Sequence, residues 1–337
     1  MFASKKASVS VHICFKETFT KCIQNYIGGF VMDWNYEPTI KDDYLIDTDR
    51  KRLWKIELDL LEWFKSVCDK ENLQYFFIGG AAIGVVRHKG FIPWDDDIDI
   101  GMLRSDFDKF NECYSEYLTP EISVQFGLMK QSFAYFMRIR NENSTGIIKE
   151  QVGMEMSHGV FIEIYPFDFV PKSRLLRSIQ WKFSMKLINI INNRYYARSL
   201  SSIEQVMNKT LSKKSTLELY SLWYKVCTFF NGLCKQKVDT VSIPAYSSSE
   251  VDFYDYCDVA YTQKAVFENT EVQIPCGNHT CLTKAYGDYM KLPPIEERGA
   301  HHSHVIYYDV YNSYRKYEDK VDDLKRYFDG EIDRIDL

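Results

Sequence analysis

The sequence predicts an α+β fold, and three observations carry that prediction. Residues 48–70 read as a long amphipathic helix, while 98–102 and 159–165 read as strands that each carry acidic residues. Apolar residues recur at helical intervals in the first segment and alternate with other residues in the two strands. A chain of 337 residues is long enough for two domains, or for one catalytic domain with a large insertion.

Composition is that of a globular enzyme. The chain is 45% apolar and 26% charged, and its net charge of −5 argues against a nucleic-acid partner. Its nine cysteines form no CxxC pair, which favours a reducing cytoplasm. The sequence shows no convincing signal peptide and no apolar run long enough for a transmembrane helix. Met32 is an alternative start to Met1, since residues 1–31 look weakly connected to the rest.

The first helix leads into a motif suited to anions. A stop is expected at Asn72, and residues 73–78 form a buried-strand candidate that ends at Gly79-Gly80. Residues 81–88 then read as a short helix of small and apolar residues. A strand, a Gly-Gly turn and a helix N-terminus present backbone amides that no side chain blocks, so Gly79 and Gly80 are expected to bind phosphate.

Four aspartates follow within five positions, at Asp95, Asp96, Asp97 and Asp99. Carboxylates packed this closely share protons or bind a divalent metal. A calcium loop of the EF-hand type is excluded, because its sixth position is Ile100 rather than Gly and its twelfth is Asp rather than Glu. A solvated acidic turn is the simpler alternative, but the apolar residues that alternate with the acids favour a half-buried strand.

A second acidic strand offers a further ligand. In GVFIEIY, residues 159–165, Glu163 lies between Ile162 and Ile164, and Asp168 follows shortly after. A carboxylate at such a position either faces a cleft or is exposed on a one-sided sheet. Given the upstream cluster, we expect Asp97, Asp99 and Glu163 to converge at the ends of adjacent strands.

Residues 172–237 are strongly basic, with thirteen Lys or Arg residues against two acids, Glu204 and Glu218. Apolar residues at helical intervals, from Leu175 to Ile191 and from Leu219 to Phe230, predict two or more basic amphipathic helices. Such helices bind an anionic membrane surface or a polyanionic glycan. A basic solvated face on an ordinary helical subdomain is the alternative.

The motifs at 79–110, 159–171 and 267–302 resemble the LicD family, which groups with fukutin-related proteins among the nucleotidyltransferases. The resemblance implies a DNA-polymerase-β-like nucleotidyltransferase fold, with a mixed sheet flanked by helices. It also implies transfer of a substituted phosphate, such as phosphocholine from CDP-choline, to a sugar hydroxyl of a cell-surface glycan or glycolipid, as in lipopolysaccharide or teichoic acid biosynthesis. Two departures from the family pattern are Ala81-Ala82 where Thr-Leu is common and Glu163 where Asp is common.

On this basis Asp97, Asp99 and Glu163 are expected to hold Mg²⁺, or Mn²⁺ in its place, with Glu163 as a ligand or as the base that accepts the acceptor's proton. Trp94 is expected to stack on a base, to contact a quaternary ammonium or to pack in the core. A loop that begins at Tyr286 is expected to close over the site. The remaining candidates for substrate or phosphate contact are basic residues: Arg87, His88, Arg138, Arg140, Arg298 and His302.

The expected organisation has five parts. They are an N-terminal extension (1–46), a catalytic core (47–171), a basic helical insertion (172–250), a return to the core with the closing loop (251–310), and a charged C-terminal helix or tail (311–337). The expected partners are a CDP-linked donor, a glycan or lipid-linked glycan acceptor and, through 172–237, the inner face of an anionic membrane. Alternative functions are a nucleotidyltransferase, a polyol-phosphate transferase of the fukutin type, and a non-catalytic binding protein.

Overall fold

The computed structural model describes residues 34–130, 133–195, 199–231, 240–243, 253–299 and 305–337. The chain divides into Met1–Glu37 and a compact unit, Pro38–Leu337. The compact unit begins with a two-stranded hairpin, β1 (Thr39–Lys41) and β2 (Tyr44–Ile46). It therefore includes the last residues of the segment that the sequence predicted to be an extension.

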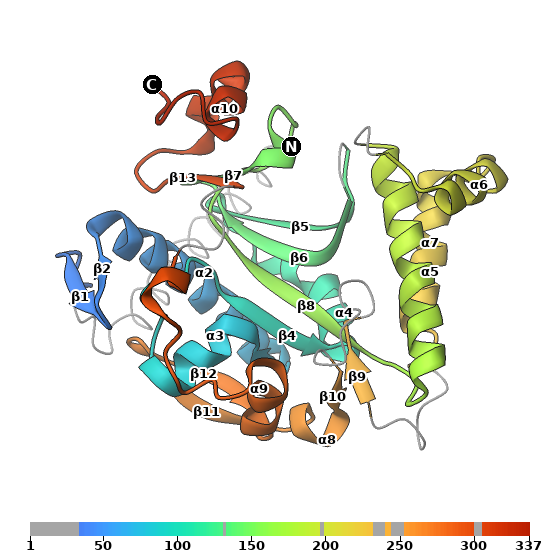
Figure 1. Cartoon of the computed structure of the whole chain (residues 1–337), viewed down its shortest axis with the longest axis horizontal. Helices are drawn as coiled ribbons and strands as arrows, with labels where there is room; N and C mark the ends of the chain where they lie inside the picture. The colour runs from blue at the N-terminus through green and yellow to red at the C-terminus, as the bar shows by residue number, and fades with distance from the viewer. Residues whose placement is uncertain (1–33, 131–132, 196–198, 232–239, 244–252, 300–304) are drawn as a thin grey trace, which may run out of the picture. The chain divides into compact units, whose positions relative to one another are not determined.

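A mixed sheet of seven described strands forms the centre of this unit and curls across it (Figure 1). Its main path runs β10-β9-β8-β4-β3, and β6 joins β8 to β5. The bounds of these strands are β3 Phe76–Phe77, β4 Asp99–Leu103, β5 Ile122–Leu128, β6 Phe133–Asn141, β8 Phe161–Phe169, β9 Thr240–Ser242 and β10 Tyr254–Asp255. The pair β4 and β8 is parallel, whereas β3–β4 and β6–β8 are antiparallel. Helices flank the sheet, so the predicted α+β class is confirmed.

The first helix of the unit, α2 (Thr48–Glu71), matches the predicted helix closely. The Asp47 side chain caps its start by accepting a hydrogen bond from the Arg50 amide at 2.8 Å. Asn72 ends it in the left-handed conformation, with φ of 53°, which asparagine tolerates. Its apolar face packs on the core through Leu61 and Phe64, which have no exposed surface. This packing fixes α2 beside the sheet.

The Gly-Gly segment differs in detail from the prediction. The strand before it is short, and Gly79 and Gly80 are the first residues of α3 (Gly79–Ile83) rather than a turn ahead of a helix. The chain continues as a wider, π-helical turn, Gly84–His88. Gly79 has a φ of +57°, a conformation that favours glycine.

Smaller elements surround the sheet. The other strands are β7 Thr145–Ile148, which pairs with β13 Ile306–Asp309, and the hairpin β11 Thr262–Phe267 with β12 Thr270–Pro275. The other helices of the core are α4 Arg104–Cys113, α8 Tyr256–Val259, α9 Asn278–Tyr286 and α10 Val321–Phe328. Single 3-10 turns lie at Tyr114–Tyr117, Lys149–Gln151, Ile295–Glu297 and Tyr314–Tyr317.

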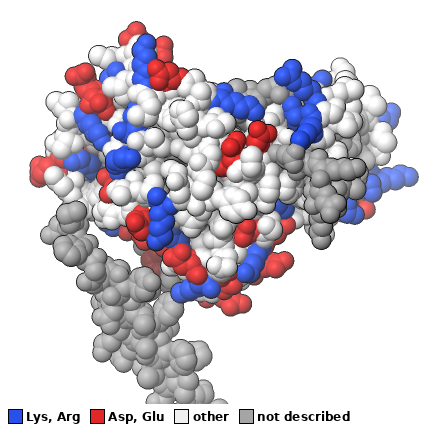
Figure 2. Space-filling view, turned by 90° about the horizontal axis from the view of Figure 1, so that it is seen from below, with Lys and Arg blue, Asp and Glu red and all other residues white. Residues whose placement is uncertain are grey.

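Three helices fill the predicted basic segment: α5 Arg174–Asn193, α6 Ser202–Thr210 and α7 Thr216–Thr228. They stand together at one side of the sheet (Figure 1), where Lys and Arg outnumber Asp and Glu (Figure 2). Their shared core is formed by Leu187 and Ile191 of α5 against Leu219 and Trp223 of α7. Ser201 and Ser215 begin α6 and α7 with reciprocal capping boxes, which explains why these short helices start where they do.

The apolar residues of α5 lie on two sides of the helix, one buried and one exposed. Leu187 and Ile191 are buried, but Leu175 is 70% exposed and Ile179 is 55% exposed. At 3.6 residues per turn, Leu187 lies roughly 120° around the helix from Leu175, so the two belong to different faces. The exposed apolar face of α5 therefore comprises Leu175, Leu176, Ile179 and Phe183.

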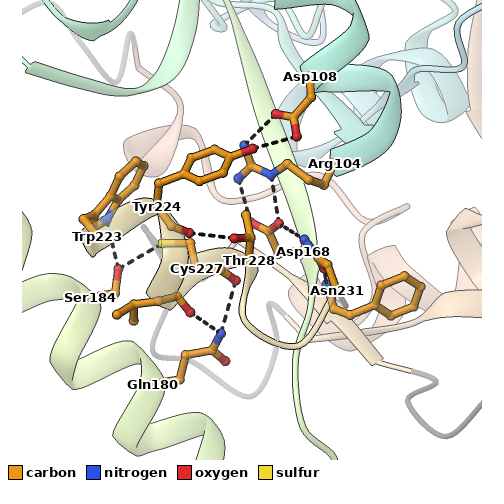
Figure 3. A network of polar contacts seen from close by, with 12 residues as sticks. Arg104, Asp108, Asp168, Gln180, Ser184, Trp223, Tyr224, Cys227, Thr228 and Asn231 are labelled. Atoms are coloured by element: carbon orange, nitrogen blue, oxygen red, sulfur yellow. Dashed lines mark hydrogen bonds and ion pairs between the residues drawn. The ribbon is translucent and has the colours of Figure 1, made fainter. Parts of the chain in front are cut away.

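A buried ion pair ties these helices to the sheet (Figure 3). Arg104 of α4 donates two hydrogen bonds to Asp168 of β8, at 2.8 and 2.7 Å. Asn231, just after α7, donates to the same carboxylate at 2.6 Å, and Tyr224 of α7 donates to Asp108 of α4 at 2.7 Å. Asp168, the carboxylate that follows Glu163 in the second acidic strand, is thus part of the junction between the sheet and the helical segment.

None of the helices in the described part of the chain is both long and apolar enough to cross a membrane.

Candidate active site

Two acidic strands bring their carboxylates to one place. Asp99 is the first residue of β4, and its register partner on the parallel strand β8 is Glu163. Register partners on neighbouring strands present their side chains on the same face of a sheet. The Glu163 amide donates to the Ile98 carbonyl at 3.1 Å, which fixes the start of the pairing. Asp97 lies two residues before β4, so it precedes the strand rather than belonging to it.

The carboxylates around Asp97 repel one another. Burial raises the pKa of Asp97 well above its usual range, and the charges of Asp99, Asp95 and Asp96 raise it further. A cation placed among these groups would reverse this effect, because it favours the ionised form.

The two glycines lie directly against this cluster. A Cβ atom on Gly79 would meet Asp99 Oδ2 at 3.5 Å, and one on Gly80 would meet Asp95 Oδ2 at 2.7 Å. The second distance is too short for a side chain, so only glycine allows Asp95 to approach. The start of α3 and the acidic segment therefore come together as the sequence predicted, with carboxylates next to the glycines.

Glu163 is held by two neighbours. Arg138 of β6 donates from Nε to Glu163 Oε1 at 2.8 Å, and the Tyr165 hydroxyl donates to Glu163 Oε2. The Arg138 guanidinium also lies over the rings of Phe136 and Phe161, at 4.6 and 5.2 Å. Arg138 is thus positioned beside the predicted site, through contact with one of its carboxylates.

Arg140, two residues further on, has a different environment. It is fully buried and donates to the Gly159 carbonyl at 2.6 Å and to Gln125 Oε1 at 2.7 Å. Burial lowers the pKa of Arg140 to about 9. The Arg140 guanidinium is enclosed by the protein, where it joins β6 to the segment before β8. The structure therefore does not place Arg140 for the phosphate contact that the sequence predicted.

Arg87 and His88 lie at the end of the π-helical turn. Arg87 donates to the carbonyls of Tyr289 and Lys291, at 2.7 and 3.3 Å. It thereby holds the segment that the sequence predicted to be a closing loop. His88 Nε2 lies 3.0 Å from Asp42 Oδ2, and burial, with the nearby charges of Arg87 and Lys41, lowers the pKa of His88 to about 4. His88 is therefore neutral at pH 7.

Trp94 is buried, with 4% of its surface exposed. The Arg298 guanidinium lies 5.2 Å from its ring centroid, and Tyr44 packs edge-on at 6.0 Å. Arg298 also donates to the Asp42 carbonyl at 2.7 Å. In this arrangement the cation beside Trp94 is a protein side chain. His302 lies outside the described residues.

Three further residues belong to this region although the sequence did not single them out. Glu57 of α2 is 1% exposed and interacts electrostatically with Asp96. Arg50 donates to the Asp95 carbonyl at 3.0 Å and lies 3.7 Å from Asp96 Oδ2. Tyr308 of β13 also faces the acidic cluster, since burial and the charges of Asp96 and Glu57 raise its pKa well above its usual range. Glu57 could have been recognised in the sequence, because it is an acidic residue on the apolar face of a predicted helix, four residues after Leu53.

Arg50 and Tyr308 also line an open cavity of about 430 Å³. Its size suits a small-molecule ligand. Its walls combine aromatic and acidic side chains from the start of α2 and from β13: Asp47, Asp49, Tyr307, Asp309 and Tyr311.

The chemistry of the cluster fits a hard divalent cation, since its donors are carboxylate oxygens. Among the residues that the structure describes, no three acidic, histidine or cysteine side chains gather closely enough to hold an ion by themselves. Mg²⁺ does not need such a cage, because it keeps several waters and takes one or two carboxylates together with substrate phosphates. Asp97 and Asp99 supply such a pair.

Comparisons with known proteins find similar sequences for much of this chain. Residues 72–188 match the model of the LicD/FKTN/FKRP nucleotidyltransferase domain. The lipopolysaccharide cholinephosphotransferase LicD of Haemophilus influenzae is 28% identical over 265 residues, which cover 74% of this chain and 94% of that protein. An uncharacterised protein of Rickettsia typhi is 28% identical over 114 residues, 34% of this chain and 35% of its own length. A second uncharacterised protein, from Rickettsia prowazekii, is 49% identical over 52 residues, 15% of this chain and 18% of its own.

The matched region contains the Gly-Gly segment, the acidic strand β4 and the strand β8 with Glu163. Residues 72–188 of the chain are therefore similar to the LicD-family domain that the motifs resemble.

Proposed function

We propose that this protein transfers a substituted phosphate of the phosphocholine type from a CDP-linked donor to a sugar hydroxyl of a cell-surface glycan or glycolipid. The observation that carries the proposal is the register of Asp99 opposite Glu163, with Gly79 against Asp99. The similarity to a lipopolysaccharide cholinephosphotransferase across 74% of the chain supports it. We assign the domain, on the same grounds, to the DNA-polymerase-β-like nucleotidyltransferase fold.

The proposed cofactor is Mg²⁺, with Mn²⁺ as a substitute, held by Asp97 and Asp99. When bound there, the ion would neutralise charge on the donor's phosphates. Glu163, on the neighbouring strand, would contact the water shell of the ion rather than the ion itself, because no three acidic side chains of the described residues gather closely enough to hold it. Hydrogen bonds from Arg138 and Tyr165 orient the Glu163 carboxylate.

In the proposed reaction, an acceptor hydroxyl oxygen attacks the phosphorus that carries the head group. A bond forms between that oxygen and the phosphorus, and the bridging P–O bond to the nucleotide breaks. CMP leaves with the bonding electrons, and the acceptor's proton passes to a base at the site or to solvent. Arg50, beside Asp95 and Asp96 at the rim of the cavity, is suited to contact a donor phosphate.

The cavity beside the cluster favours a cationic head group. Three tyrosines and three aspartates line it, against Arg50 as the one basic residue among its described lining. Aromatic faces and carboxylates attract a quaternary ammonium group. A choline-like head group in this cavity would lie next to the phosphate that the acidic cluster receives.

The exposed apolar face of α5 is proposed to bind the cytoplasmic face of the membrane near the acceptor. Helix α5 contains four Lys or Arg residues and no acid. Lys182 and Lys186 lie on the same side of the helix axis as its exposed apolar residues, at 100° per residue. A face that mixes lysines with Leu175, Ile179 and Phe183 suits the interface of an anionic bilayer.

Two related functions use the same site. A nucleotidyltransferase would transfer the nucleoside monophosphate instead and release pyrophosphate from a triphosphate donor. A polyol-phosphate transferase of the fukutin type would differ only in the head group. Product analysis separates them: release of CMP from CDP-choline in the presence of Mg²⁺ supports the proposal, and release of pyrophosphate from CTP without CMP would contradict it.

A further inference from the structure

Helix α2 carries an acidic residue inside the protein. Glu57 is 1% exposed, whereas Asp59 on the same helix is exposed to solvent. Moving a carboxylate out of water destabilises a fold by several kcal/mol unless the charge is paired and hydrogen-bonded. Its position therefore needs an explanation beyond packing.

The neighbours of Glu57 do not neutralise it. Among the largest influences on its pKa after burial, the charges of Asp96, Asp95 and Asp99 raise it and that of Arg50 lowers it. The Arg50 guanidinium is directed at the Asp95 carbonyl and the Asp96 carboxylate. The nearby aspartates thus oppose the ionised form of Glu57 rather than stabilise it.

One oxygen of Glu57 is oriented for a ligand. Its Oε2 atom is buried and has no hydrogen-bond partner among the described residues. On the same helix, Arg50 and Trp54 both donate to the Asp95 carbonyl, each at 3.0 Å, and Glu57 follows them on the same helical face, seven and three residues further on. Glu57 therefore faces the same small region as the acidic cluster, from a helix that the domain motifs do not include.

We infer that Glu57 is a positioning residue of the divalent-cation centre, which it contacts through the cation's water shell. Direct ligation is disfavoured because no three acidic side chains of the described chain meet around one point. A magnesium ion retains several waters, and a buried carboxylate oxygen is a suitable acceptor for one of them. This inference depends on the proposed metal dependence of the site.

The test is Mn²⁺ binding in the presence of CDP-choline, measured by the electron paramagnetic resonance signal of free Mn²⁺ against a blank that contains the nucleotide without protein. Loss of an outer-shell partner typically weakens metal affinity by about 10- to 100-fold. We expect Glu57→Gln and Glu57→Leu to weaken Mn²⁺ binding by at least about 10-fold on this basis. The matched control is Asp59→Asn, which removes a carboxylate from the solvent side of the same helix and should leave the affinity within about twofold.

Circular dichroism shows which variants fold. The Glu57→Leu variant is included because an apolar side chain suits this buried position. Unchanged Mn²⁺ affinity in a folded Glu57 variant would overturn the inference. The proposed function fails separately: if Asp99→Asn abolishes Mn²⁺ binding while the Glu57 variants bind normally, the metal site stands and only the role of Glu57 is wrong. If the wild-type protein does not bind Mn²⁺, both are wrong.

Discussion

Asp99 and Glu163 face each other across a parallel strand pair, 64 positions apart in the chain. The pairing places one carboxylate beside Gly79 and the other under Arg138, so that the acidic centre lies between a glycine segment and an arginine. Gly79 and Arg138 are separate features of the proposed site. Each can be mutated while the carboxylates of Asp99 and Glu163 are kept.

Arg138 should act through Glu163. Arg138→Gln removes the charge-assisted hydrogen bond at 2.8 Å and leaves Glu163 free to turn. We expect kcat for donor cleavage to fall by roughly 10- to 100-fold, as is typical when the partner of a ligand is lost. Arg138→Lys should retain part of the activity, and Arg334→Gln, at an exposed arginine, should retain all of it. Wild-type kcat in Arg138→Gln would show that this contact is only structural.

Tyr308 should select for a cationic head group. A cation over an aromatic ring contributes about 0.5–2 kcal/mol. We expect Tyr308→Leu to raise KM for CDP-choline by about 10-fold, within that range, while KM for an uncharged CDP-linked polyol stays near the wild-type value. Tyr308→Phe keeps the ring and should behave as wild type. An equal rise in KM for both donors would contradict a head-group role.

The exposed face of α5 should bind anionic membranes. Ile179→Asp combined with Phe183→Asp places two negative charges on this face, where lysines are each worth about 1 kcal/mol near an anionic surface. We expect co-sedimentation with phosphatidylglycerol vesicles to be lost, and wild-type binding to weaken as salt rises. Val266→Asp, at an exposed apolar position of β11, is the control. Equal binding to neutral and anionic vesicles would refute the proposal.

Glu142 should make stability depend on pH. Burial alone would raise its pKa, but hydrogen bonds from Ser123, Ser157 and Tyr314, with the charge of Arg315, hold the pKa below the ordinary value of 4.5. Because the folded pKa is the lower one, the stabilisation is complete above the unfolded pKa and disappears as the pH falls through the folded pKa.

We therefore expect Glu142→Gln to lower the free energy of unfolding by about 1–2 kcal/mol at pH 7. Urea unfolding of both proteins at pH 7 and at pH 3.5 measures the difference. It should be smaller at the lower pH, because pH 3.5 lies below the ordinary pKa of glutamate in the unfolded chain, where the contribution of Glu142 has begun to fall. A difference that grows as the pH falls would have the wrong sign.

Local features of the fold were predictable from sequence, and contacts between distant segments were less so. The bounds of α2 depend on the Asp47 cap, a regular apolar spacing and Asn72, all of which are written in adjacent residues. The apolar spacing predicted an amphipathic helix at α5 but not which of its apolar residues are buried, because Leu175 and Leu187 lie on different sides of the helix. Which side is buried depends on where α7 packs.

The same limit applies to the site. Alternation with apolar residues was enough to predict that Asp99 and Glu163 lie on strands, and the cluster of acids upstream led to the prediction that these strands are adjacent. The surroundings of Arg138 and Arg140 could not be separated by sequence, since both lie on β6 two residues apart. One contacts Glu163, and the other is enclosed by Gln125 and the Gly159 carbonyl. Glu57 was missed because its neighbours come from β4 and β13, far away in the chain.

The most direct measurement is the release of CMP from CDP-choline with Mg²⁺ and a glycan acceptor, compared between wild type, Asp99→Asn and the control Asp59→Asn. The proposal predicts CMP in amounts equal to the phosphocholine transferred, a loss of at least about 100-fold in Asp99→Asn and no loss in the control. CMP release that is unchanged in Asp99→Asn would contradict the central role given to the acidic strand.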